Sequence, residues 1–238
     1  MTQNLSFVIV CICTVIIILA VAIVFERLAG KSTEPGKEIL TTRIIVVTGM
    51  FSAVSAILYV LDFPVFFAPG FYKLDFSELP ALIAGFAFGP VSAVLIEFIK
   101  VFLKILLKGT STAFVGDLAN FIIGCSFVLP ASIIYRMNKS KQTAKIACAA
   151  GTLIITAFGS MFNAFYLLPA FSALYGMPME NLVAAGTAVN PAITDVSTFV
   201  LFAVAPLNFI KGTLISVITM LVYKKLSVII KRSGQHAK

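Results

Sequence analysis

The chain alternates between long apolar runs and short polar segments, a pattern that predicts helices crossing a membrane. Seven apolar segments can be delimited, at residues 5–25, 44–61, 79–89, 91–107, 113–135, 145–169 and 199–223. Several reach the roughly 18 to 20 residues that a bilayer-spanning helix requires. The chain has no run of ten-residue segments of alternating polarity, the pattern typical of a membrane β-barrel. We therefore predict an all-α polytopic membrane protein.

The third and fourth segments are short and meet at Gly89-Pro90. Proline lacks an amide donor and restricts the residue before it, so a helix should break at this point. We expect residues 79–107 to form a helical hairpin or a strongly kinked pair.

Composition supports this class. Hydrophobic residues make up 60% of the chain and charged residues 12%, with a mean hydropathy of +1.05. A soluble domain carries about 25% charged residues. The net charge of +8 could suggest nucleic acid as a partner. The basic residues lie in short segments between apolar runs, however, so we interpret them as topology signals and expect no nucleic-acid partner.

The distribution of basic residues predicts the orientation. Most of the lysines and arginines lie in three segments, 26–43, 136–145 and 224–238. Positively charged segments remain in the cytoplasm. We therefore expect the N-terminus outside, the C-terminus in the cytoplasm, and Gly89-Pro90 near the cytoplasmic face.

The first apolar run, 5–25, is interpreted as a retained transmembrane helix. A signal peptide begins with basic residues and has a shorter apolar core. Here residues 1–4 carry no basic side chain, and the run is long enough to span a bilayer.

Two long outer connections follow from this topology, residues 62–78 and 170–198. Loops of this length in a compact protein are often lids or binding loops. The first is rich in Phe, Pro and Tyr. Its aromatic side chains could also sit at the membrane interface, and the residues alone leave both interpretations open.

Asn208 and Lys211 give the strongest indication of a ligand site. A lysine at the centre of a membrane helix costs about 2.5–3.5 kcal/mol, so it usually faces a polar partner or a water-filled site. Three residues apart, the two side chains share one helix face. Asn163, in another segment, could form a helix–helix hydrogen bond or belong to the same polar site.

A stripe of charged residues, Glu97, Lys100, Lys104 and Lys108, lies along one face of another predicted helix. We expect a Glu97–Lys100 pair and two lysines that extend toward the outer interface. A cradle for an acidic ligand group is the alternative. In the next segment, Asp117 fits a first-turn helix cap, and Asn120 is either a packing contact or a ligand contact.

The segment 44–61 carries small residues with small-xxx-small spacing, at Gly49 and Ala53 and at Ser52 and Ala56. Such spacing permits close approach of another helix. The pattern is compatible with internal packing or with docking of a partner subunit.

No catalytic or metal-binding set is recognisable. The four cysteines lie in apolar segments and are interpreted as small buried hydrophobes. The single histidine, His236, lies in the polar tail, and no phosphate-binding loop is present. The chain is therefore expected to be a binding subunit without a cofactor, a metal or an enzymatic activity.

Several of these residues resemble one family. Leu74-Asp75-Phe76-Ser77-Glu78-Leu79-Pro80-Ala81-Leu82, followed by Phe88-Gly89-Pro90, is similar to the first outer loop and second helix of riboflavin-binding S components of energy-coupling factor (ECF) vitamin transporters. Gly116 to Phe121 with Tyr135, Asn163 with Leu167-Leu168-Pro169, and Pro206-x-Asn208-x-x-Lys211-Gly212 resemble later helices of that family. The similarity extends over about residues 44–230.

The resemblance implies a six-helix bundle that holds the vitamin near the outer face, preceded here by one extra N-terminal transmembrane helix. It implies that Asn163, Asn208 and Lys211 hydrogen-bond the flavin. The first outer loop would close over the ligand as a lid, through Phe71, Tyr72 and Leu74. Asn120 is retained as a further candidate contact.

The resemblance also implies partners. Ser52, Ala53 and Ala56 would contact a transmembrane coupling subunit, and two cytoplasmic ATPase subunits would supply energy, in a prokaryotic cell membrane. The expected organisation is an extra helix and charged linker at 1–43, a substrate-binding domain at 44–230 and a basic cytoplasmic tail at 231–238. The alternatives are an S component for flavin mononucleotide or another vitamin, a membrane-embedded enzyme that uses Glu97 or Asp117, and a structural scaffold.

Overall fold

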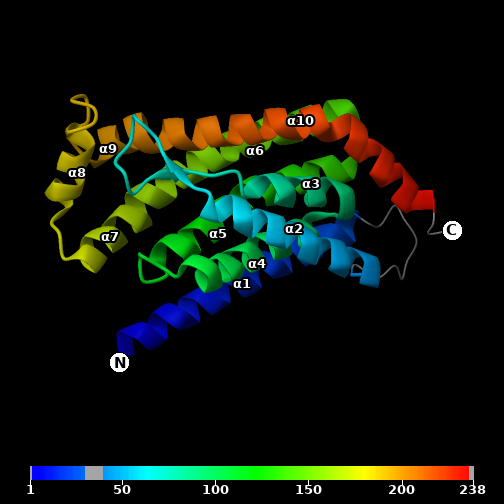
Figure 1. Ribbon diagram of the computed structural model, residues 1–238, viewed down its shortest axis with the longest axis horizontal. Helices are drawn as coiled ribbons and strands as arrows, with labels where there is room; N and C mark the ends of the chain where they lie inside the picture. The colour runs from blue at the N-terminus through cyan, green and yellow to red at the C-terminus, as the bar shows by residue number, and fades with distance from the viewer. Residues whose placement is uncertain (1, 30–39, 236–238) are drawn as a thin grey trace.

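The computed structural model describes residues 2–29 and 40–235, with side chains placed over 11–28 and 40–222. Part of the predicted charged linker, residues 30–39, and the end of the predicted basic tail, residues 236–238, lie outside the described residues. Figure 1 shows an elongated bundle of helices that run along its long axis.

The described chain is almost entirely helical, as predicted. The longer helices are α1 (Thr2–Ala29), α2 (Thr42–Val60), α3 (Glu78–Phe88), α4 (Pro90–Lys108), α5 (Val115–Met137), α6 (Lys141–Phe162) and α10 (Ala205–Gln235). The shorter elements are strands β1 (Phe63–Pro64) and β2 (Lys73–Leu74), π-helical turns η2 (Asn163–Leu167) and η3 (Val200–Val204), and helices α7 (Leu168–Tyr175), α8 (Met179–Thr187) and α9 (Val196–Phe199). The two strands form an antiparallel hairpin in the first outer connection.

Among the described residues, five stretches of helix are long and apolar enough to cross a membrane, at residues 11–28, 42–60, 115–137, 141–175 and 196–222. Helices α3 and α4 form the predicted broken pair. Gly89 between them has a φ of +118°, a conformation that suits glycine, and Pro90 opens α4. The predicted break is therefore confirmed.

The core of the bundle forms around α3, which contacts α2, α4, α5 and α10. Its largest cluster combines alanines, leucines and aromatic residues of α3, α4, α5, α6 and α10. Within this cluster the rings of Phe86 and Tyr135 stack with centroids 4.4 Å apart. Small residues let these helices approach closely, as is usual in membrane bundles.

The second outer connection, predicted as the loop 170–198, is largely helical. Helix α6 continues through η2 into α7 and ends only at Tyr175, and α8 and α9 occupy much of the remainder. Pro169 does not end the helix, because the π turn η2 comes directly before it. In that turn the amide of Leu168 bonds to the carbonyl of Asn163, five residues earlier.

The two small-residue pairs of α2 lie on different faces. Ser52 and Ala56 are buried, on the side where α2 contacts α3 and α4, whereas Gly49 and Ala53 are exposed. The expectation that all three of Ser52, Ala53 and Ala56 face a partner subunit is corrected accordingly. Ala53 is the member of this set that a partner can reach in this structure, because the other two pack within the chain.

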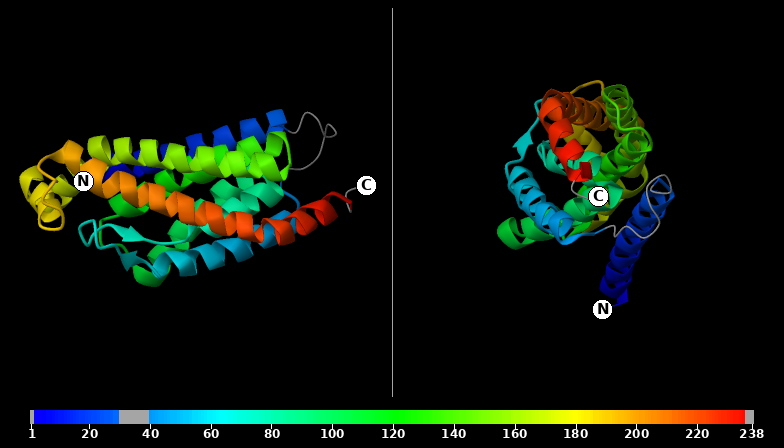
Figure 2. Two further views of the ribbon diagram at one scale, coloured as in Figure 1. Left: turned by 90° about the horizontal axis from the view of Figure 1, so that it is seen from above. Right: turned by 90° about the vertical axis from the view of Figure 1, so that its right-hand side faces the viewer.

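Helix α1 lies outside the bundle and contacts α4 and α5 (Figure 2). Near its end, Glu26 is buried and its Oε2 accepts a hydrogen bond of 3.0 Å from the amide of Val91. Its other carboxylate oxygen lies 3.4 Å from Nη2 of Arg136 on α5. Glu26 therefore caps α4 from another helix, since Gly89 has no side chain to do so.

Replacing Glu26 with alanine is expected to lower the free energy of unfolding by about 1–2 kcal/mol, the usual range for a lost helix cap. Glu26→Gln keeps an acceptor for Val91 and should lose less. Arg27→Ala, at an exposed neighbouring position, is the control. Thermal unfolding in detergent measures all three, and equal stability of Glu26→Ala and the parent would contradict the capping role.

Candidate functional site

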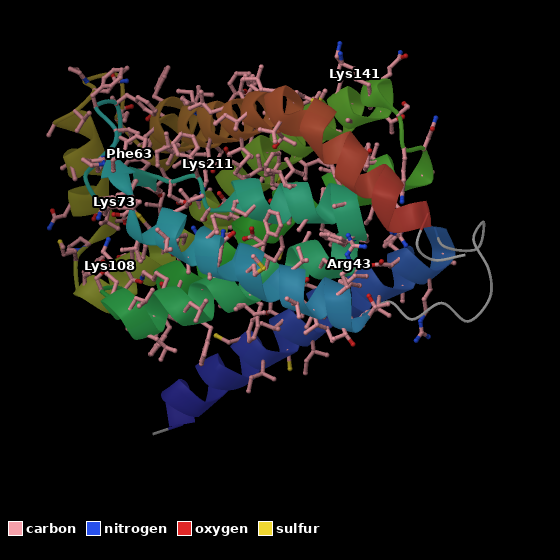
Figure 3. The ribbon with its side chains drawn as sticks, turned by 45° about the vertical axis from the view of Figure 1, so that its right-hand side comes forward. Arg43, Phe63, Lys73, Lys108, Lys141 and Lys211 are labelled. Carbon is pink, nitrogen blue, oxygen red and sulfur yellow. The ribbon has the colours of Figure 1, made fainter. Side chains whose placement is uncertain are left out.

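A cavity of about 260 Å³ lies between the first outer connection, α5, the η2–α7 segment and the start of α10. Figure 3 places Lys211, one of its lining residues, toward the end of the bundle that carries Phe63, Lys73 and Lys108. Arg43 and Lys141 lie at the opposite end. The cavity therefore belongs to the end of the bundle that the sequence predicts to be outside.

Two π turns position the polar side chains of the cavity. Asn163 is the first residue of η2, and Pro169 follows that turn by two residues. In the same way, Pro206 follows η3 by two residues, and Asn208 and Lys211 come directly afterwards. π turns are rare and are often found at functional sites. They bring Asn163, Asn208 and Lys211 from two different helices to one cavity.

The two asparagines are buried and differ in their hydrogen bonds. Asn163 donates through Nδ2 to the carbonyl of Gly159 at 2.7 Å, and its Oδ1 accepts from the Tyr72 hydroxyl at 2.6 Å. The Nδ2 group of Asn208 has no hydrogen-bond partner among the described residues. A side chain at Gly159 would meet this amide at 2.7 Å, so glycine provides the room for it.

Asn120 on α5 also lines the cavity, and its buried Oδ1 lacks a protein partner within the described part of the chain. Buried polar atoms are nearly always paired, and each exception calls for an explanation. Asn208 supplies an unpaired donor and Asn120 an unpaired acceptor on the same cavity. This pairing suits a ligand that carries both acceptor and donor groups.

Lys211 is ion-paired and also lines the cavity. Its Nζ lies 3.0 Å from Oδ2 of Asp75 and 2.7 Å from Oε1 of Glu78. An ammonium group has three donors, so two acidic contacts leave capacity for one more acceptor. The lysine is therefore compensated by protein acids and still has a donor for a ligand.

The same ion-paired cluster extends away from the cavity. Oε1 of Glu78 also lies 3.2 Å from Nζ of Lys100, which is 2.7 Å from Glu97 and donates to the Ser77 hydroxyl at 2.7 Å. The Glu97–Lys100 pair is thus confirmed. Lys100 itself is fully buried, so the possibility that it extends toward a ligand phosphate is excluded in this structure.

The other lysines of the predicted stripe have acidic partners. Asp117 lies in the first turn of α5, as predicted. It is also a buried ion-pair partner, with Oδ1 2.6 Å from Nζ of Lys104. Lys108 and Lys73 lie 3.0 Å and 3.3 Å from the same Asp62 oxygen at the exposed end of the bundle.

Asp75 belongs to the first outer connection, outside the helices. Burial raises the pKa of this carboxyl, but the ammonium groups of Lys211 and Lys100 and the hydrogen bonds from Ser77 outweigh it, so its pKa lies below the usual value. Asp75 therefore stays ionised at neutral pH. By contrast, burial raises the pKa of the Tyr72 phenol, which remains a neutral donor to Asn163.

An apolar wall faces these polar groups. It is built by Phe71, Leu167, Phe171, Val204 and Leu207. The rings of Phe71 and Phe171 meet edge to face with centroids 6.1 Å apart. A flat aromatic ligand could lie against this wall with its polar edge toward the amides.

Most of the predicted ligand residues line this one cavity. They are Phe71, Tyr72, Asn120, Asn163, Asn208 and Lys211. Leu74 does not, because it packs into the apolar cluster behind Tyr72 with Phe199 and Leu207. Their roles toward a ligand stay predictions.

Asp75 and Glu78 were not predicted as site residues, although both lie in the motif Leu74 to Leu82. A polar partner was predicted for the intramembrane lysine, and charge balance indicates that this partner should be acidic. Asp75, Glu78 and Asp117 are buried, as Glu97 is.

Comparison with known proteins agrees with this arrangement. The family model for the ECF transporter, substrate-specific component, matches residues 43–223. A solved structure, described as the S component of a bacterial ECF transporter, is 32% identical with a TM-score of 0.62 and covers 79% of this chain and 98% of that one. The chain therefore belongs to the substrate-specific components of ECF transporters, a family of membrane transport subunits without enzymatic activity.

Individual relatives are named as riboflavin transporters. The riboflavin transporter RibU of Staphylococcus aureus (strain TCH60) is 36% identical over 188 residues, covering 79% of this chain and 92% of that protein. The riboflavin transporter FmnP of Bacillus subtilis (strain 168) is 31% identical over 185 residues, covering 76% and 90%. Helix α1 precedes the region that the family model matches.

Proposed function

We propose that this protein is the riboflavin-binding S component of an ECF transporter, and that residues 44–230 form its substrate-binding domain. The observation that carries the proposal is the convergence of Asn163, Asn208 and Lys211 on one cavity beneath the aromatic outer loop. The family membership and the names of its relatives support the same ligand.

The chemistry of the cavity suits this ligand. The isoalloxazine ring of riboflavin is flat and largely apolar, and its polar edge presents carbonyl acceptors and an imide donor. The apolar wall matches the ring, and the unpaired groups of Asn208 and Asn120 match the polar edge. A few directed polar groups in a mostly apolar pocket are typical of small-molecule sites.

Charge favours riboflavin over its phosphate. The ionisable acids and lysines that line the cavity balance one another, with Asp62, Asp75 and Glu78 against Lys73, Lys104 and Lys211. Each of these lysines already has an acidic partner. No uncompensated cation on this wall is therefore ready to receive a phosphate, which disfavours flavin mononucleotide.

The partners follow from the family. We infer that the subunit works with a transmembrane coupling protein and two cytoplasmic ATPases, without a cofactor of its own. The exposed small residues Gly49 and Ala53 of α2 are the candidate contact surface for the coupling protein.

We infer that the cavity opens to the outside and that the C-terminus is cytoplasmic. Arg43 and Lys141 gather at the end of the bundle opposite the cavity (Figure 3). Positively charged segments favour the cytoplasmic side. A fluorescent-protein fusion at the C-terminus should therefore fold and emit in bacterial cells.

Riboflavin binding to the purified protein tests the proposal. Quenching of flavin fluorescence in detergent should report saturable binding, with flavin mononucleotide competing at least about tenfold more weakly, because its charge is uncompensated in the cavity. Equal competition by the mononucleotide would support the second ligand. Absence of binding by any flavin would refute the proposed function.

A further inference from the structure

The carboxylate of Asp75 joins the first outer loop to the wall of the cavity. It is the loop's contribution to the buried ion-paired cluster, since Glu78 belongs to α3, Lys211 to α10, and Lys100 and Glu97 to α4. Its Oδ1 accepts a hydrogen bond of 2.9 Å from the amide of Ser77, which fixes the carboxylate toward Lys211. Only 3% of Asp75 is exposed.

The loop is tied to the cavity at two points. Tyr72 donates to Asn163, and Asp75 pairs with Lys211. Both helical partners line the cavity. Tyr72 therefore occupies the amide oxygen of Asn163, and Asp75 compensates the charge of Lys211. The loop thus limits what these two side chains can offer to a ligand.

The charge of the cavity wall depends on Asp75. With it, the lining acids and lysines balance one another. Without its charge, the wall would carry one uncompensated positive charge. The remaining acidic partner of Lys211 would be Glu78, which Lys100 already shares. In a buried site, such a charge is screened far less than at a surface.

Resting on the riboflavin-binding function proposed above, we propose that Asp75 is a specificity-determining residue of this site. By neutralising Lys211 from the loop side, it makes the closed cavity suit an uncharged flavin and disfavours a phosphorylated one. Lys211 then acts as a hydrogen-bond donor toward the ligand, without attracting anions.

The size of the effect follows from Coulomb's law. An added unit charge about 10 Å from a phosphate, at an effective dielectric constant of about 20, changes the affinity for the anion by about tenfold or more. The affinity for neutral riboflavin carries no such term. The ratio of the two dissociation constants is therefore the informative quantity.

The test compares riboflavin with flavin mononucleotide in the full-length protein. Asp75→Asn keeps an acceptor for Ser77 and removes the charge. We expect the ratio of the dissociation constant for the mononucleotide to that for riboflavin to fall about tenfold. Asp75→Glu, which keeps the charge, should keep the parent ratio. Glu180→Gln, at an exposed position of α8 in the other outer connection, is the matched acid-to-amide control.

The outcomes separate electrostatics from loop anchoring. If Asp75→Asn weakens both flavins by the same factor, Asp75 only fastens the loop, and the proposal is overturned. An unchanged ratio with unchanged affinities overturns it too. Should Asp75→Asn fail to fold, Glu78→Gln removes the other acidic contact of Lys211, and the ratio must fall in the same direction. If the parent protein binds no flavin, the function itself is refuted and this inference falls with it.

Discussion

Replacing Asn208 with alanine is expected to weaken riboflavin binding by about tenfold or more, while leaving the protein as stable as the parent. Among the described residues, the Nδ2 group of Asn208 is buried without a hydrogen-bond partner, so its removal breaks no hydrogen bond that this donor makes within the protein. A lost hydrogen bond to the ligand accounts for the reduced affinity. Lys211→Met should weaken binding more, by about 100-fold, because the lost donor is charged.

Stability distinguishes these two variants. Lys211→Met leaves Asp75 and Glu78 buried with less compensation, which typically costs about 3–5 kcal/mol. Ser216→Ala is the control, since Ser216 joins α10 to Thr152 of α6 outside the cavity. Fluorescence titration and thermal unfolding measure the two effects. Parent-like riboflavin affinity in Asn208→Ala would contradict a ligand-binding role for this amide.

Replacing Lys100 with methionine is expected to destabilise the protein as strongly as Lys211→Met does. It leaves Glu78 and Glu97 buried with fewer cationic partners, at a cost of about 3–5 kcal/mol. Lys108→Met, further along the same helix α4, breaks an exposed pair with Asp62 and should cost about 0–1 kcal/mol.

Unfolding in detergent compares these variants directly. The double variant Lys100→Met/Glu97→Gln removes one of the uncompensated acids and should recover part of the lost stability. Equal melting temperatures for Lys100→Met and Lys108→Met would show that burial does not set the strength of these pairs.

Much of the fold could be predicted from the sequence because a bilayer imposes length and polarity on every crossing segment. The apolar runs predicted the helices, and Gly89-Pro90 predicted the break between α3 and α4. The segment 145–169 was predicted to end at Pro169, whereas the segment 199–223 was predicted to continue through Pro206. A proline usually ends a helix, yet here each follows a π turn and the helix continues.

Part of the candidate site could be predicted because polar residues are rare in membrane-spanning segments. An asparagine and a lysine in an apolar run stand out, so Asn208 and Lys211 could be named together. Their acidic partners could not, because Asp75 and Glu78 precede them by more than a hundred residues and lie at the edge of an apolar segment. The spacing of small residues on α2 left internal packing and partner docking open, and the family resemblance placed Ser52 and Ala56 on a partner surface. Which face of α2 is buried could not be predicted from spacing alone.

The two π turns make the geometry of the site depend on residue count as well as residue type. A π turn contains one residue more than the α-helical turn it replaces, and each residue of an α-helix corresponds to about 100° of rotation. Deleting a single residue from 163–167 or from 200–204 would restore an ordinary α-helix. The extra residue is absorbed within the turn, so the segments on either side keep nearly the same relative rotation with or without it. A residue inserted or lost in the ordinary α-helix beside a turn would instead rotate one segment by about 100° and part the outer aromatic wall from the amides below it. The α-helical stretches that flank 163–167 and 200–204 should consequently keep their lengths in related chains, while the two turns are the places where a one-residue difference can be absorbed.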